Sequence, residues 1–151
     1  MILFKETGRM IQLPSVQQIQ TILRNNTVIA VVGLSSREDR PSNQVARYMR
    51  AAGYRVIPVN PGQSEIFGEK CYPDLHSVPE HIDIVTIFRR SDQVLPVVQD
   101  AIAKKAKVIW MQEGIVNEPA ARLAKEHGLT VIMDRCIKVD HQQFFASPEE
   151  V

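Results

Sequence analysis

Five short, mostly apolar runs lie along the chain, and the first of them, Val28-Ile-Ala-Val-Val32, is apolar without alternation. They cover residues 28–32, 54–59, 82–88, 108–111 and 130–133. An unbroken apolar run of this length, bounded by glycine, proline or polar residues, is typical of a strand that is buried on both faces of a parallel sheet. The pattern therefore predicts five parallel strands.

Apolar residues at helical spacing fill most of the segments before and between these runs. Ser15, Ser42 and Asn117 are each predicted to cap a helix, and Ser91-Asp92 opens a further one. The segment after Cys136 has no clear pattern. Strands that alternate with helices through short connections predict an α/β fold, a Rossmann-like doubly wound sheet with helices on both faces.

The chain is long enough for one such domain. Its 151 residues, 44% of them hydrophobic, can build one core. We expect a single domain over residues 1–151, with 1–13 as an N-terminal extension and 142–151 as a tail. Residues 60–79 form the longest irregular stretch, and they are predicted to be a surface excursion.

Charge and cysteine content exclude several classes of function. Eighteen basic residues against seventeen acidic ones give no electrostatic reason to expect nucleic acid or an anionic membrane as partner. The first thirteen residues lack the apolar core of a secretory signal, and no apolar stretch is long enough to cross a bilayer. Cys71 and Cys136 are far apart and outside any CxxC motif, so we expect reduced thiols and a cytoplasmic location.

The loop after the first strand carries the strongest candidate chemistry. It joins a buried strand to the start of a helix, whose first N–H groups have no partner within the helix and attract phosphate. Glycine permits close approach of backbone to a ligand, and the loop adds three serine hydroxyls and two arginines, which bind phosphate well. The residues concerned are Gly33, Ser35, Ser36, Arg37, Arg40 and Ser42. A solvated loop with an ordinary helix cap is the alternative interpretation.

The same loop departs from the dinucleotide fingerprint. That motif needs three glycines and an acidic residue about 20 positions further on. Here the later glycines are missing, and Asn60 stands near the place of the acidic residue, which argues against NAD. An NAD(P)-binding redox or regulatory module, in which Arg37 or Arg40 receives a 2′-phosphate, remains the alternative.

Two other strand ends carry polar residues. Arg89-Arg90 follows the third strand and makes a second spot that favours anions, unless these arginines pair with Asp92 or Glu113. Gln112-Glu113 follows the fourth strand, where we expect a hydrogen-bonding role.

Catalysis is not indicated by these residues. An enzyme acting on a nucleotide-linked substrate would need Glu113, Cys136 and His141 to converge, and no credible set of acid, base and nucleophile is close in sequence. We therefore predict no catalytic residue. The other histidines lack metal-ligand spacing, so no metal site is expected.

Six segments, taken in order and spacing, resemble the small CoA-binding domain proteins, which are similar to the N-terminal CoA-binding domain of the succinyl-CoA synthetase alpha subunit. The resemblance extends from about Ser15 to His141. The segments are Val31-Val-Gly-Leu-Ser-Ser36, Arg40-Pro-Ser42, Gly53-Tyr-Arg-Val-Ile-Pro-Val-Asn-Pro61, Phe88-Arg-Arg90, Trp110-Met-Gln-Glu-Gly-Ile115 and Asp134-Arg-Cys136.

The resemblance implies that the chain binds coenzyme A or an acyl-CoA without independent catalysis. The synthetase's second domain, which carries the phosphorylated histidine, has no counterpart in these residues, so ligase activity is not implied. The small-molecule cofactor is the partner that follows, no protein partner is indicated, and a homodimer through an exposed helix is compatible with the sequence. The implied cofactor-binding residues are Gly33, Leu34, Ser35, Ser36, Arg40, Ser42 and Asn43 at the phosphates, and Asn60, Pro61, Phe88, Arg89, Arg90, Gln112 and Glu113 along the remainder.

Overall fold

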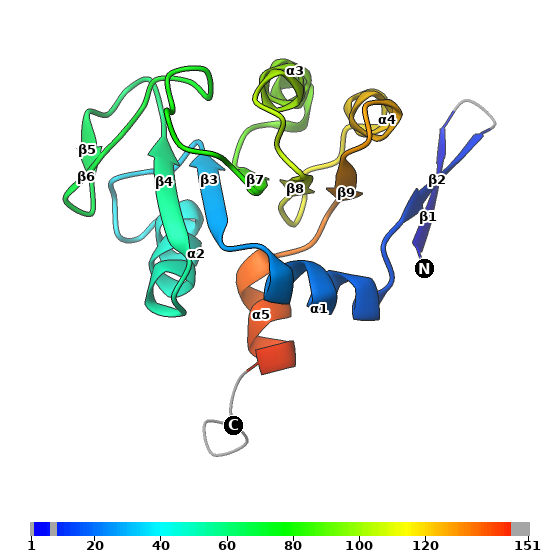
Figure 1. The fold of residues 1–151 in the computed structure, drawn as a ribbon, viewed down its shortest axis with the longest axis horizontal. Coiled ribbons are helices and arrows are strands. Elements are labelled where there is room, and N and C mark those ends of the chain that lie inside the picture. Colours follow the sequence, from blue (N-terminus) through cyan, green and yellow to red (C-terminus); the bar gives the residue numbers. More distant parts are fainter. Residues whose placement is uncertain (1, 7–8, 146–151) are drawn as a thin grey trace.

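A five-stranded parallel sheet forms the centre of the molecule. The computed structural model describes residues 2–6 and 9–145. The sheet has the strand order β4-β3-β7-β8-β9 and confirms the predicted doubly wound fold (Figure 1). Its strands are β3 (Val28–Val32), β4 (Arg55–Val59), β7 (Ile84–Ile87), β8 (Val108–Met111) and β9 (Thr130–Ile132).

Helices cover both faces of this sheet, as Figure 1 shows. One face packs against α3 (Val94–Ala103) and α4 (Glu118–Glu126), and the 3-10 turn η1 (Ser91–Gln93) precedes α3. The other face packs against α1 (Val16–Asn25), α2 (Pro41–Ala51) and α5 (Ile137–Phe145). None of the helices in the described ranges is both long and apolar enough to cross a membrane.

Strand β3 shows why the apolar runs do not alternate. Ala30 and Val32 join the core under α3 and α4, whereas Ile29 and Val31 join the core under α1 and α2. Both faces of the strand are buried, so both need apolar side chains. The strand predicted over 82–88 is shorter in the structure, at Ile84–Ile87, although Asp83 N and Phe88 N still donate to the Val28 and Val32 carbonyl oxygens.

Two of the three predicted helix caps are confirmed. Ser15 accepts a hydrogen bond from Gln18 N at 3.2 Å, and the Gln18 side chain accepts one from Ser15 N, which completes a capping box. Asn117 accepts from the Ala120 N–H at 2.9 Å. The prediction for Ser42 was wrong: the cap position is occupied by Arg40, and α2 begins at Pro41, whose fixed φ suits a first helical position.

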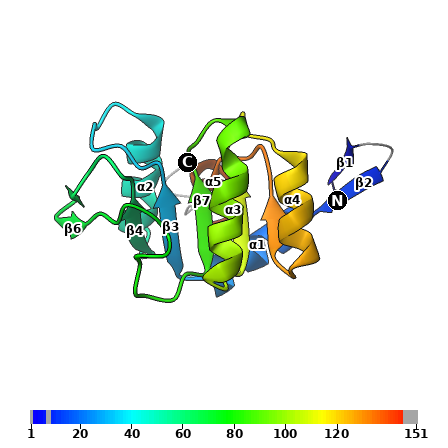
Figure 2. The same cartoon turned by 90° about the horizontal axis from the view of Figure 1, so that it is seen from above.

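Two hairpins and one helix were absent from the predicted pattern. The N-terminal extension forms β1 (Ile2–Glu6) and β2 (Arg9–Leu13), an antiparallel pair that projects beyond β9 in Figure 2. The long excursion contains the very short pair β5 (Glu65–Ile66) and β6 (Glu69–Lys70). The unassigned segment after Cys136 becomes α5 and packs against α1 and α2.

Asp83 ties three strands together where they begin. Its carboxylate accepts hydrogen bonds from Thr27 N (3.1 Å) and Val28 N (3.0 Å), and its backbone oxygen accepts from Lys107 N and Val108 N. Burial opposes ionisation of this carboxyl, but the two N–H donors, with His81 and Lys107, outweigh burial and hold its pKa below the ordinary value.

We predict that Asp83→Asn lowers the free energy of unfolding at pH 7 by about 1 to 3 kcal/mol, since a charged acceptor of two backbone N–H groups is lost. The pKa of Asp83 is lower in the folded protein than its unfolded value of about 3.9. Its contribution is therefore complete above about pH 4 and is lost as the pH falls through the folded-state pKa.

Urea unfolding at pH 7 and in acid checks this prediction. The difference between wild type and Asp83→Asn should be full at pH 7 and should shrink in acid. The exposed carboxyl of Asp92 supplies the control, because Asp92→Asn should leave stability nearly unchanged at both pH values. A penalty for Asp83→Asn that stays constant into acid would contradict the role given to its ionised form.

Candidate functional site

The candidate site lies where the strand order reverses, between β3 and β7. In open α/β sheets ligands bind beside this point, outside the carboxyl ends of the strands. Gly33 and Phe88 each follow one of these two strands. Gly33 has φ +87°, and a Cβ placed on it would lie 2.2 Å from the Phe88 carbonyl oxygen. The two loops are therefore in direct backbone contact, which only glycine permits.

Side chains from α2 and from the end of β4 hold the first loop in shape. Ser42 Oγ accepts a hydrogen bond from Ser35 N (3.0 Å), and Asn43 Nδ2 donates to the Ser35 carbonyl oxygen (2.8 Å). Asn60 Nδ2 donates to the Leu34 carbonyl oxygen (2.9 Å). The structure thus brings the predicted residues of the first loop together with Asn60, and it gives Ser42, Asn43 and Asn60 the task of bracing the backbone.

The outer part of this loop is open to solvent. Ser36 and Arg40 are exposed, and Arg40 directly precedes the first residue of α2. Arg37 is paired with Asp39 at 3.1 Å, whereas Arg40 forms no ion pair with a described residue. Sequence reasoning did not find Arg47, which donates to Asn43 Oδ1 (2.8 Å) and to the Glu38 carbonyl oxygen (2.9 Å).

The second loop places two arginines with different surroundings. Arg90 Nε lies 3.5 Å from Asp92 Oδ1, and both side chains are about three-quarters exposed, at 75% and 74%. The predicted alternative of pairing with Asp92 therefore holds for Arg90. Arg89 is half-buried and has no ion pair within the described ranges. Arg89 and Arg40 are thus two cations at this edge of the sheet that have no ion-pair partner among the described residues.

Beyond the two loops, the predicted residues divide between buried and exposed positions. Gln112 is 3% exposed, and its Oε1 accepts from Ile137 N at 3.2 Å. Glu113 and Pro61 are exposed at the same edge of the sheet, after β8 and β4. Gln112 therefore belongs to the wall of the site, and Glu113 and Pro61 to its rim.

The three groups that an enzyme would need do not converge. Glu113 follows β8 at the carboxyl edge of the sheet. His141 instead accepts or donates at Nδ1 with the Tyr48 hydroxyl (2.8 Å) and lines a cavity of about 500 Å³ with Thr27 and Gly53, which precede strands. It therefore lies at the amino edge, where burial lowers its pKa. An acid–base pair of Glu113 and His141 is excluded by this placement.

The surroundings of His76, His81 and Cys71 indicate structural roles. His76 and His81 are exposed beside Asp100 and Asp83, and no group of three metal-ligating side chains occurs among the residues that the structure describes. Cys71 is buried, which raises the pKa of its thiol. Neither cysteine is in a disulfide.

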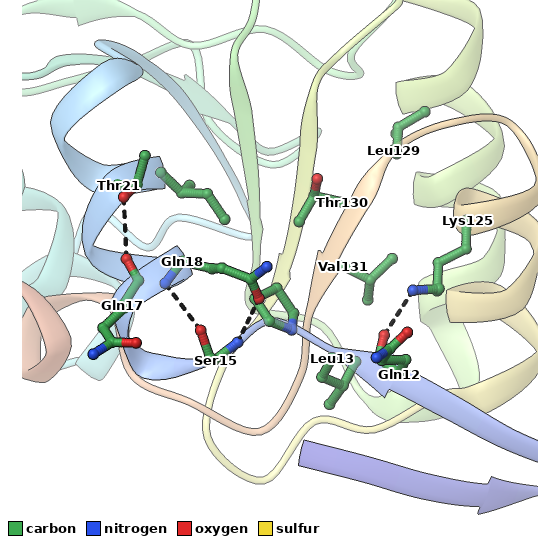
Figure 3. Close-up of a pocket in the computed structure, with 12 residues that line it drawn as sticks. Gln12, Leu13, Ser15, Gln17, Gln18, Thr21, Lys125, Leu129, Thr130 and Val131 are labelled. Carbon is green, nitrogen blue, oxygen red and sulfur yellow. Dashed lines mark hydrogen bonds between the residues drawn. The ribbon is translucent and has the colours of Figure 1, made fainter. Parts of the chain in front are cut away.

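A further cavity lies away from these loops. It measures about 710 Å³ and lies between β2, α1, α4 and β9, as Figure 3 shows. Lys125 is its one charged lining residue in the described part of the chain, and its Nζ already donates to the Gln12 carbonyl oxygen at 2.6 Å. This cavity offers a phosphate no free cation, so the loops at the switch point remain the better anion site.

Comparisons with known proteins identify the family of this chain. The family model of the CoA binding domain matches residues 27–142, which include all of the loops described above. The uncharacterized protein YneT of Bacillus subtilis (strain 168) is 48% identical over 130 residues, which cover 86% of this chain and 96% of YneT. The crystal structure of Prb, a PH1109 protein redesigned for binding, superposes with a TM-score of 0.90 at 36% identity, covering 93% of this chain and 99% of that one.

A larger relative supplies a chemical context. The ADP-forming acetate–CoA ligase I of Archaeoglobus fulgidus is 28% identical over 120 residues, which cover 73% of this chain but only 18% of the ligase. The similarity thus concerns one part of that enzyme. With its parallel sheet, its paired loops and a family match over most of its length, this chain belongs to the CoA binding domain family.

Proposed function

We propose that the chain binds coenzyme A or an acyl-CoA, with the phosphates of the ligand on the loop after β3. The observation that carries this proposal is the contact between the two loops at the switch point. Gly33 has no side chain there, α2 begins beside it, and Arg40 and Arg89 lack ion-pair partners among the described residues. Phosphate oxygens would satisfy both the free N–H groups of α2 and these two cations.

Coenzyme A suits this edge better than NAD does. An NAD site holds the ribose hydroxyls with a carboxylate at the end of the second strand. Asn60 occupies that place, and both ends of its amide are engaged, with the Leu34 carbonyl oxygen and with Gly62 N (2.9 Å). Family membership supports the same ligand.

The function is binding without independent catalysis of ligase type. The matched segment is only 18% of the ligase to which the chain is similar, so the activity of that enzyme is not carried over to this chain. Within the described residues, the only candidates for acid–base chemistry lie at opposite edges of the sheet. The proposed role is that of a carrier or sensor of the coenzyme.

Thermal unfolding with a panel of ligands tests this function. We expect CoA and acetyl-CoA to raise the midpoint by about 5 to 10 °C at a concentration about 100 times their Kd, because a ligand of the native state stabilises by mass action. NAD, NADPH and ATP at the same concentration should have little effect. A shift with NADPH alone would overturn the ligand, and no shift with CoA at near-millimolar concentration would overturn the function.

The close approach at Gly33 gives a sharper prediction. Gly33→Ala should weaken CoA binding at least about 10-fold, because its Cβ must displace the Phe88 carbonyl and with it both loops. Gly128 is the matched control: its φ is +82°, but no atom lies within 4 Å of an added Cβ. Gly128→Ala should cost about 1 to 2 kcal/mol of stability and leave affinity unchanged. Isothermal titration of both variants decides the matter, and equal affinities would contradict the placement of the ligand.

The charge of Arg40 can be tested in the same way. We expect Arg40→Gln to weaken CoA binding by about 10- to 100-fold, the effect of losing one charge-assisted hydrogen bond worth about 1.5 to 3 kcal/mol. Arg24→Gln removes the same charge at the amino edge of the sheet, where Arg24 lines the cavity with Thr27. If both variants lose affinity equally, only the net charge matters and the proposed contact is wrong.

A further inference from the structure

The turn from β9 to α5 is fixed to the end of β8 by four hydrogen bonds. Two of these bonds are made by side chains at the end of β8. A third is made by a side chain of the turn, and the fourth joins two backbone groups. They are Gly114 N to Asp134 Oδ1 (2.6 Å), Arg135 N to the Met111 carbonyl oxygen (3.4 Å), Trp110 Nε1 to the Arg135 carbonyl oxygen (2.8 Å) and Ile137 N to Gln112 Oε1 (3.2 Å). Such a turn holds its remaining side chains in place.

Cys136 lies in the middle of this turn, at the start of α5. Its carbonyl oxygen accepts the first helical hydrogen bond, from Asp140 N at 3.0 Å. Arg135 donates two hydrogen bonds, of 2.8 and 2.7 Å, to the buried carboxylate of Asp140. The thiol is half-buried and outside any disulfide. The structure therefore presents a positioned thiol at the amino end of a nine-residue helix.

A buried donor without a partner belongs to Gln112, whose amide oxygen is bonded to the residue after Cys136. Gln112 is 3% exposed, and its Nε2 has no hydrogen-bond partner among the described residues. Its Oε1 is bonded to Ile137 N, the residue after Cys136, so the amide group faces the start of α5. Buried polar groups in proteins are nearly always paired, and an orphan at a strand end indicates that an acceptor binds there.

The position of this donor fits the far end of the proposed ligand. Gln112 follows β8, which is two strands away from β3 in the sheet. Neighbouring strands are about 4.8 Å apart, so the start of α5 lies about 10 Å along the same edge from the phosphate loop. The pantetheine arm of CoA spans this distance. Its sulfur, or the carbonyl of an acyl thioester, would then reach the start of α5.

We propose that the start of α5 is the thioester end of the site and that Cys136 accepts the acyl group of a bound acyl-CoA. This inference rests on the proposed binding of CoA. Gln112 Nε2 and the N–H groups of Lys138 and Val139, the second and third residues of α5, hold the thioester oxygen, whose negative charge grows during attack.

The reaction is an exchange of one thioester for another. The deprotonated sulfur of Cys136 forms a bond to the acyl carbon, the bond from that carbon to the CoA sulfur breaks, and CoA leaves as a thiolate that takes a proton from solvent. No oxidant or further reactant is consumed.

Intact-protein mass spectrometry after incubation with acetyl-CoA tests the proposal. We expect one acetyl group, removable by neutral hydroxylamine, on Cys136, formed at least about 100-fold faster than on glutathione under the same conditions. Cys71→Ser should retain this acetylation, Cys136→Ala should lose it, and Gln112→Met should slow it about 10-fold or more at saturating acetyl-CoA. S-acetyl-N-acetylcysteamine, a thioester without the nucleotide, should react at least about 10-fold more slowly than acetyl-CoA.

Thermal unfolding and CoA titration on each variant separate the outcomes. Intact folding and CoA binding by Cys136→Ala show that its loss of acetylation is chemical. If acetyl-CoA binds the wild type but Cys136 remains unmodified, or reacts no faster with acetyl-CoA than with the short thioester, acyl transfer is wrong while the binding function stands. If CoA does not bind at all, both proposals fail together.

Discussion

The Phe88 carbonyl oxygen occupies the space in which any side chain at position 33 would begin, 2.2 Å from an added Cβ. This close approach is possible because β3 and β7 are adjacent parallel strands, with the loop after β3 leading to one face of the sheet and that after β7 leading to the other. The backbone of each loop is thus fixed by the other. Arg40, Arg89 and the start of α2 take their positions from this contact, and so does the proposed phosphate site.

The polar groups at the two edges of the sheet have different roles. At the amino edge, buried or paired charges close the structure: Asp83 joins three strands, and Arg55 pairs with Glu80 (2.7 Å) and Glu69 (2.8 Å). At the carboxyl edge, cations and a buried amide donor lack partners among the described residues. Unpaired polar groups cost stability, so their concentration at one edge indicates the edge where a ligand binds.

Sequence reasoning predicted the fold well where one local signal decides the structure. β3 and β8 were predicted to the residue, because a strand buried on both faces must be apolar throughout. It missed α5, whose buried residues are only Ile137 and Asp140 while Val139 is 44% exposed, so no apolar stripe marks the helix. Ser42 was wrongly predicted to cap α2, because its hydroxyl instead accepts a hydrogen bond from Ser35 N in the loop before that helix.

The sequence indicated which residues belong to the candidate site better than it indicated the role of each one. The phosphate loop is contiguous in sequence, so its residues could be named together. That Asn43 and Asn60 brace this loop, and that His141 lies at the opposite edge from Glu113, depends on contacts across the fold that no spacing reveals. The tie between Gln112 and the start of α5 joins residues 25 positions apart and was likewise invisible.

A crystal structure of the complex with coenzyme A would show where the ligand lies. We expect the diphosphate against the backbone from Gly33 to Asn43, within hydrogen-bond reach of Arg40, and the sulfur near the start of α5. Coenzyme A bound in the cavity between α1 and α4, or at the amino edge beside His141, would contradict this expectation.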